Sequence, residues 1–203
     1  MATGNNSNAA FYSISNGKIC RQFSQPTEHS ISRVNMNTKT VHEEFYDYID
    51  GTITNIETRE STYGKQWIVT LRDQDGSTQQ LQMNYSGGYA AALLKTLPNV
   101  DLSAKVKITP KLTVEGEKKK TTLFINQHGV ALKHYFTKDN PNGLPQLKKV
   151  KIKGKEAWDD SDVMEFLENM VKTSIIPKLK AVPAPVAVDA SGNDADEKDD
   201  LPF

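Results

Sequence analysis

Residues 41–136 alternate apolar and polar side chains with a period of two, and one stretch of helical period interrupts the alternation. Such alternation is typical of strands that bury one face. The expected elements are a long strand over about 42–57, further strands in the regions 67–71, 81–85, 105–114 and 123–125, and a helix over 88–97 that Pro98 ends. Gly51 marks a bulge or a sharp bend in the long strand.

This order, β-β-β-α-β-β, predicts a mainly β protein whose core is a five-stranded oligonucleotide/oligosaccharide-binding (OB) barrel. That fold places its helix between the third and fourth strands. A mixed α+β sheet would give the same order of elements. We favour the closed barrel because closure leaves no unpaired strand edges.

The segments on either side of this core carry their own signals. Asn16 and Gly17 favour a type I′ turn, which predicts a hairpin of residues 10–15 and 18–23. Apolar spacing predicts an amphipathic helix over 159–174, packed on its own barrel or on a second subunit and ended by Pro177. The expected organisation is a disordered N-terminus (1–9), a hairpin and loop (10–40), the OB-fold core (41–136), a basic segment with the C-terminal helix (137–180), and a Pro/Ala spacer with an acidic tail (181–203).

The net charge of zero conceals a strong asymmetry along the chain. Residues 181–203 hold six acidic side chains and one lysine, whereas residues 103–155 hold 13 basic side chains and three acidic ones. A basic body with an acidic tail indicates a polyanionic ligand such as nucleic acid.

Several classes of protein are excluded or disfavoured by the sequence. No apolar run approaches the roughly 18 residues of a membrane span, and the N-terminus lacks a secretory signal. Cys20 is the only cysteine, so we expect neither disulfides nor a Cys-rich zinc site, and we place the protein in the cytoplasm of a bacterium or of a phage-infected cell. The histidines show no metal-ligand spacing, and we interpret Asp159, Asp160 and Asp162 as helix caps. We therefore expect no cofactor and no enzymatic activity.

The chain ends in an apolar tip that follows two carboxylates: Asp199, Asp200, Leu201, Pro202 and Phe203. This ending resembles the C-terminal tips of bacterial single-stranded DNA-binding proteins, and T7-like phage proteins of the same class also end in an acidic tail closed by Phe. The resemblance covers the tip closely and the rest of the chain only by element order, and it implies that the tip recruits replication or recombination enzymes. Phe203 supplies an aromatic anchor, and the aspartates suit a basic pocket rim.

Strand parity predicts which residues bind nucleic acid. If Ile49, Ile53, Leu123 and Ile125 point inward, the rings of Tyr46, Tyr48 and Phe124 point outward, where they can stack on bases. Tyr63 lies in the loop between the first two strands of the core. The candidate cations lie on outward positions or in the two binding loops of an OB barrel: Arg59, Lys65, Arg72, Lys105, Lys107, Lys111, Lys118, Lys119 and Lys120.

The sequence thus predicts a non-enzymatic, sequence-independent single-stranded DNA-binding protein of replication, recombination or repair. Its polymerase, helicase or nuclease partners would dock on the tip, and the acidic tail would compete with DNA for the basic surface. One alternative is an OB-like adaptor that binds another protein. Another is a metal-dependent nuclease or an annealing recombinase that uses Asp159, Asp160 and Asp162.

Overall fold

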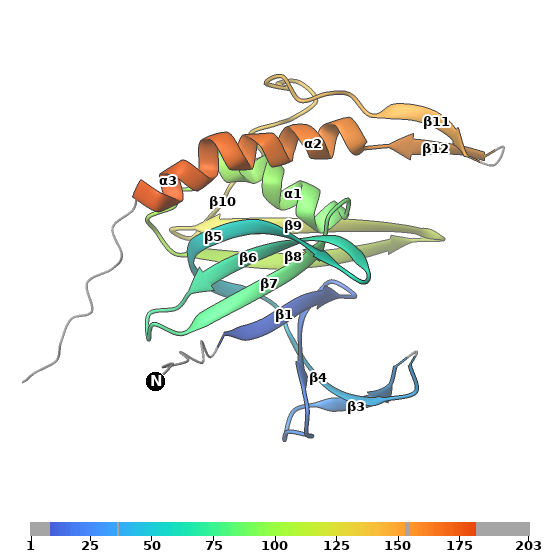
Figure 1. Cartoon of the computed structure of the whole chain (residues 1–203), viewed down its shortest axis with the longest axis vertical. Helices are drawn as coiled ribbons and strands as arrows, with labels where there is room; N and C mark the ends of the chain where they lie inside the picture. The colour runs from blue at the N-terminus through green and yellow to red at the C-terminus, as the bar shows by residue number, and fades with distance from the viewer. Residues whose placement is uncertain (1–8, 36, 153–154, 182–203) are drawn as a thin grey trace, which may run out of the picture.

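The computed structural model describes residues 9–35, 37–152 and 155–181, and over these ranges the chain is mainly β (Figure 1). Ten strands form one sheet in the order β10-β9-β8-β5-β6-β7-β1-β2-β4-β3. These strands are β1 (Ala10–Ser15), β2 (Lys18–Phe23), β3 (Ile31–Val34), β4 (Thr40–Tyr46), β5 (Ile49–Ser61), β6 (Gly64–Arg72), β7 (Thr78–Asn84), β8 (Val106–Glu115), β9 (Lys118–Gln127) and β10 (Val130–Ala131). A separate two-stranded ribbon consists of β11 (Lys148–Ile152) and β12 (Lys155–Asp159).

The helices occur in two places along the chain. Helix α1 (Gly88–Thr96) and a short 3-10 turn (Leu97–Asn99) lie between β7 and β8. The C-terminal helical segment consists of α2 (Ser161–Met170), a π-helical turn (Val171–Ile175) and α3 (Ile176–Ala181). Among the described residues, no helix has the length and apolar character needed to cross a membrane.

The five strands expected in the core are present as β5 to β9, and α1 follows β7 as expected. They do not form a five-stranded closed barrel, so that part of the prediction is wrong. β1 pairs in parallel with the outer edge of β7, and β10 extends the sheet beyond β9. The result is an open sheet of ten strands. The N-terminal hairpin takes the edge that barrel closure would have covered, which removes the physical reason for closure.

The strand expected over 42–57 is in fact two strands, β4 and β5, separated at Asp47 and Tyr48. β4 pairs with β2 and β3 in an arm that leaves the body of the protein (Figure 1). Phe45 consequently lies exposed instead of on the buried face that a continuous alternation would give it. The break places Tyr48 immediately before β5.

β5 bends at Gly51, as the sequence predicts. Residues 49–51 pair with β8, whereas the strand pairs with β6 from Thr52 onward. A Cβ atom at Gly51 would lie 2.9 Å from the carbonyl oxygen of Arg72, so only glycine fits this approach of two backbones. The bend lets one strand serve both halves of the sheet.

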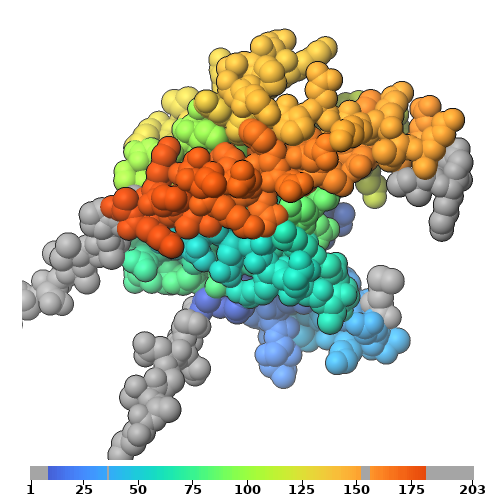
Figure 2. All heavy atoms as spheres, turned by 45° about the horizontal axis from the view of Figure 1, so that its top comes forward, coloured from blue at the N-terminus to red at the C-terminus, as the bar shows by residue number. Residues whose placement is uncertain are grey.

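The hydrophobic core lies between the curved sheet and the helices that cover it (Figure 1). Leu93 of α1 and Leu167 of α2 are fully buried in one cluster with Trp67, Leu81 and Ile108 of the sheet. Figure 2 shows α2 and α3 lying against the teal surface of β5 and β6. The amphipathic C-terminal helix therefore packs on its own sheet.

This helical segment continues through Pro177, contrary to the expectation that Pro177 ends it. Pro177 is the second residue of α3 and follows the π-helical turn. A proline inside a helix lacks a donor, and its ring crowds the carbonyl group four residues earlier. A π turn joins residues five apart and absorbs such a local mismatch.

Candidate nucleic-acid interface

Two exposed aromatic rings flank one residue of β8 on the outward face of the sheet. The register joins Ile49 to Ile108 and Phe124 to Thr109, and its extension by one residue before β5 brings Tyr48 into the row of Thr109 and Phe124. Tyr48 is 45% exposed and Phe124 is 43% exposed. Since adjacent strands lie about 4.8 Å apart, the two rings stand on either side of Thr109 and face solvent. The prediction from strand parity that these two rings point outward is confirmed.

Lysines lie along the same face of the sheet as this aromatic row. The Lys107 ammonium nitrogen lies 3.7 Å from the centroid of the Tyr48 ring, a cation–π contact. Lys111 lies two residues beyond Thr109 on the same outward parity of β8. Lys118 and Lys120 share the parity of Phe124 on β9. We call these six residues the outer surface: Tyr48, Lys107, Lys111, Lys118, Lys120 and Phe124.

The loop between β8 and β9, one of the two loops expected to bind nucleic acid, is shorter than the sequence predicts. Lys118, Lys119 and Lys120 are the first residues of β9 and pair with the end of β8, which leaves Gly116 and Glu117 as the turn. Lys119 has the parity of the buried Leu123 and so points away from the outer surface, although it is exposed at the tip of the hairpin. The sequence analysis treated these three lysines alike, although they point to opposite sides of the hairpin.

Of the other predicted cations, Lys105 and Arg59 form ion pairs with carboxylates and Arg72 is half-buried. The Lys105 ammonium lies 3.2 Å from Asp50 and 3.5 Å from Asp73, and the hydrogen bond with Asp50 raises the pKa of Lys105. Arg59 lies 2.9 Å from Glu57, and both side chains are exposed. Arg72 is half-buried at the end of β6. An exposed ion pair of this kind contributes little to stability and can be exchanged for a phosphate, so Lys105 and Arg59 stay candidates for phosphate contacts.

Lys65 belongs to an internal cluster. Its ammonium lies 2.6 Å from Glu168, which also accepts a hydrogen bond from Tyr85 at 2.6 Å and pairs with Lys172 at 2.7 Å. Burial opposes ionisation of Glu168, but the hydrogen bonds from Lys172, Lys65 and Tyr85 outweigh it and lower the pKa to about 2. The cluster ties α2 to β6 and to the residue after β7, so Lys65 holds the fold together and is not part of the outer surface.

Tyr46 is also less free than its parity suggests. It is half-buried, its hydroxyl donates to Glu44, and its ring meets Tyr12 edge-on at 6.2 Å. Burial and the bond with Glu44 raise the pKa of Tyr46 to about 12. This ring is an internal contact between β4 and β1 and is not a stacking platform.

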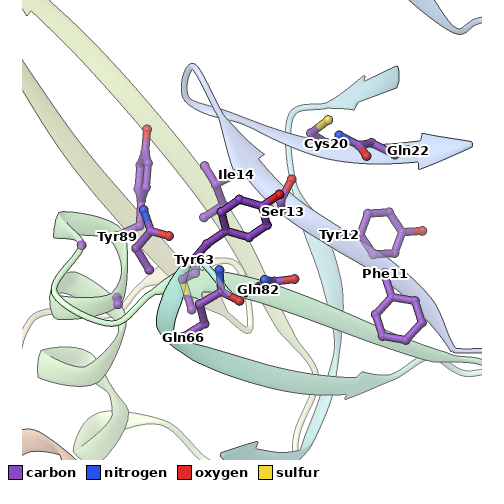
Figure 3. A pocket seen from close by; sticks show the side chains of 14 residues that line it. Phe11, Tyr12, Ser13, Ile14, Cys20, Gln22, Tyr63, Gln66, Gln82 and Tyr89 are labelled. Atoms are coloured by element: carbon purple, nitrogen blue, oxygen red, sulfur yellow. Dashed lines mark hydrogen bonds between the residues drawn. The ribbon is translucent and has the colours of Figure 1, made fainter. Parts of the chain in front are cut away.

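A cleft of about 520 Å³ opens where β1 separates from β7. The parallel pairing of these strands ends at Tyr12 and Leu81, after which β1 pairs only with β2, and β7 only with β6. The turn between β5 and β6 brings Tyr63, 83% exposed, to one side, and the start of α1 brings Tyr89 to another (Figure 3).

Amide side chains line the cleft beside the aromatic rings. Gln66 of β6 and Gln82 of β7 lie together in Figure 3, and the Gln82 amide nitrogen donates to the Gln66 oxygen. Gln22 of β2 also lines the cleft and donates to Glu43 at 2.9 Å. Arg59 stands one strand away, directly opposite Gln66 in the register.

Sequence reasoning found only Tyr63 among the residues of this cleft. Phe11 and Tyr12 enter it because β1 pairs with a strand far along the chain, and no local pattern reveals that pairing. The available signal was the run of amide side chains at alternate positions of β7: Gln80, Gln82 and Asn84.

The three aspartates considered for a metal have separate structural partners. Asp159 accepts hydrogen bonds from the backbone and the hydroxyl of Ser161, the first residue of α2, whereas Asp162 pairs with Lys148. Asp160 is the N-cap residue, but its side chain makes no capping bond. Within the described ranges, no three His, Cys, Asp or Glu side chains gather in a way that could hold a metal ion.

Comparison with known proteins adds no assignment. No protein-family model, curated protein sequence or solved structure matches this chain. The predicted partner-binding tip, Asp199 to Phe203, lies outside the described residues.

Proposed function

We propose that this chain is a sequence-independent single-stranded DNA-binding protein of replication, recombination or repair. The observation that carries the proposal is the row of Tyr48, Thr109 and Phe124, with two exposed rings set among the lysines of the outer surface. Cations neutralise a nucleic-acid backbone, and flat rings stack on unpaired bases whatever their sequence.

The same surface favours single strands over duplexes. The bases of a duplex are already stacked and paired, so Tyr48 and Phe124 have no free base face to meet unless the duplex opens. Lysine is a flexible point charge and carries no bidentate code for a base edge. Affinity that depends on charge and stacking is sequence-tolerant.

The proposal includes a recruiting role for the tail. The acidic segment followed by Leu201, Pro202 and Phe203 has the composition of a docking peptide, with an aromatic anchor and carboxylates for a basic rim. The enzymes recruited would be a polymerase, a helicase or a nuclease that works on the coated strand.

Fluorescence titration of the intact protein with oligo(dT) at two salt concentrations tests the DNA-binding role. We expect binding that weakens steeply as salt rises. Phe124→Ala should weaken it roughly 5- to 150-fold if one base stacks on the ring. Tyr135→Ala is the matched control, since Tyr135 is 41% exposed but lies beside α1, where its backbone N–H donates to the Lys95 carbonyl at 2.8 Å.

A protein that shows no salt-dependent affinity for oligo(dT) is not a single-stranded DNA-binding protein, and the adaptor alternative would then stand. Equal losses in Phe124→Ala and Tyr135→Ala would mean that the outer surface is not where the bases stack. Thermal unfolding of both variants excludes a general loss of fold as the cause.

A further inference from the structure

The cleft between β1 and β7 has an unusual lining for a protein that binds a polyanion. Within the described part of the chain, none of the residues that line it is charged. Its walls are rings and amides, chiefly Phe11, Tyr12, Tyr63, Gln66, Gln82 and Tyr89. A volume of about 520 Å³ falls in the usual range for small organic ligands, about 300–1,000 Å³. The lining therefore fits an uncharged, flat, polar-edged ligand better than a phosphate.

The amides hold unused hydrogen-bonding capacity. The bond from Gln82 to Gln66 uses one donor and one acceptor of the pair. Among the described residues, the Gln82 oxygen and the Gln66 nitrogen have no further hydrogen-bond partner. They offer an acceptor beside a donor, the arrangement that the edge of a nucleobase complements. Because a Gln side chain presents both functions, such a site accepts different bases.

The surroundings of the cleft supply the remaining parts of a nucleotide site. Tyr63 projects from a short turn with its ring free to cover a ligand, as Figure 3 shows beside Ser13 and Ile14. Arg59 stands one strand outside the amides, where a backbone phosphate would pass if the base pointed inward. Its partner Glu57 is exposed, so the ion pair can be exchanged at small cost.

We infer that this cleft binds one unstacked nucleobase of the bound strand, with Tyr63 against its face and Gln66 and Gln82 on its edge. The inference rests on the proposed single-stranded DNA-binding function and adds a second site, separate from the outer surface. The acidic tail of the chain is a poor occupant, because its carboxylates would find no cation among the lining residues.

A thermodynamic cycle between protein and DNA tests the inference. The affinities of the wild type and of Tyr63→Ala are measured for oligo(dT) and for an oligonucleotide of equal length whose residues are abasic. Stacking of one base accounts for roughly 5- to 150-fold in affinity. Tyr63→Ala should lose that factor on oligo(dT) and little on the abasic strand. Tyr63 is exposed in a turn, so the variant keeps its fold.

Gln82→Leu is the second variant, because it keeps the size of the side chain and removes its amide. It should also lose more affinity for oligo(dT) than for the abasic strand. Gln80→Leu is the matched control: Gln80 lies two residues away on the same face of β7 but does not line the cleft.

The outcomes separate the two levels of the proposal. If the wild type binds oligo(dT) but Tyr63→Ala and Gln82→Leu lose equally on both strands, or lose nothing, the cleft holds no base and only this inference falls. If the wild type does not bind oligo(dT), the proposed function falls and the inference falls with it. The control can also contradict the inference. If Gln80→Leu loses as much affinity for oligo(dT), relative to the abasic strand, as Gln82→Leu does, the assignment of the base to the cleft is wrong.

Discussion

Three consecutive lysines at the start of β9 give the sharpest test of the outer surface. Lys118 and Lys120 share the outward parity of Phe124, whereas Lys119 points to the opposite side of the hairpin. All three are exposed, and none forms an ion pair with another described residue. Changing them to Gln therefore alters charge with little effect on stability.

The expected result depends only on the side of the hairpin to which each lysine points. Each phosphate contact on a single strand contributes about 0.7 to the slope of log affinity against log salt concentration. Lys118→Gln with Lys120→Gln should reduce the slope by about 1.4 if both meet the backbone. Lys119→Gln should leave it unchanged, although this variant too removes a cation from the same hairpin.

The measurement is a series of oligo(dT) titrations over several salt concentrations, with thermal unfolding as the check on fold. Loss of one phosphate contact lowers the slope by about 0.7. If Lys119→Gln lowers the slope by that amount, the argument from strand parity is refuted. A double variant with the wild-type slope would show that this end of the outer surface does not touch DNA.

Three further predictions concern the tail, the internal cluster and the bend. Deleting Phe203 should leave oligo(dT) affinity unchanged and weaken recruitment of a cognate enzyme roughly 10- to 100-fold, measured by pull-down or stimulation of that enzyme. Glu168→Gln should lower the free energy of unfolding by roughly 2–3 kcal/mol at pH 7, measured in urea. Since the folded pKa is lowered, this carboxylate stabilises the wild type above about pH 5 and stops doing so as pH falls toward 2, so the difference between the two proteins should shrink there. Gly51→Ala should cost roughly 1–3 kcal/mol because its Cβ meets the Arg72 carbonyl, and more than Gly76→Ala, where no atom lies within 4 Å.

The elements of this fold were largely predictable, because each has a local cause. Asn16 and Gly17 fix the hairpin at residues 10–23, and alternation locates β6 to β9 around buried positions such as Trp67 and Ile108. Parity likewise predicted the exposed rings of Tyr48 and Phe124. Such signals depend only on neighbouring residues.

The arrangement of those elements was not predictable from the same signals. Alternation says which face of a strand is buried, but it does not say which strand lies alongside it. Nothing near Ala10 shows that β1 pairs with β7, so the open sheet and the cleft went unforeseen. The partners of Lys65 and Lys105 come from distant elements too, and a cation in the sequence cannot reveal that a carboxylate already meets it.

The short pairing of β1 with β7 also sets how the cleft can move. Three residue pairs join these strands, whereas nine join β5 to β6. Local opening in a folded protein follows the segments with the fewest cooperative contacts. Ile19 of β2 is fully buried in the core, so the part of the hairpin most able to leave the sheet is the start of β1, residues 10–12. Amide hydrogens of residues 10–12 should exchange through such openings, and a ligand that bridges the two strands would slow that exchange and also stabilise the protein against global unfolding, because it binds neither the open nor the unfolded state.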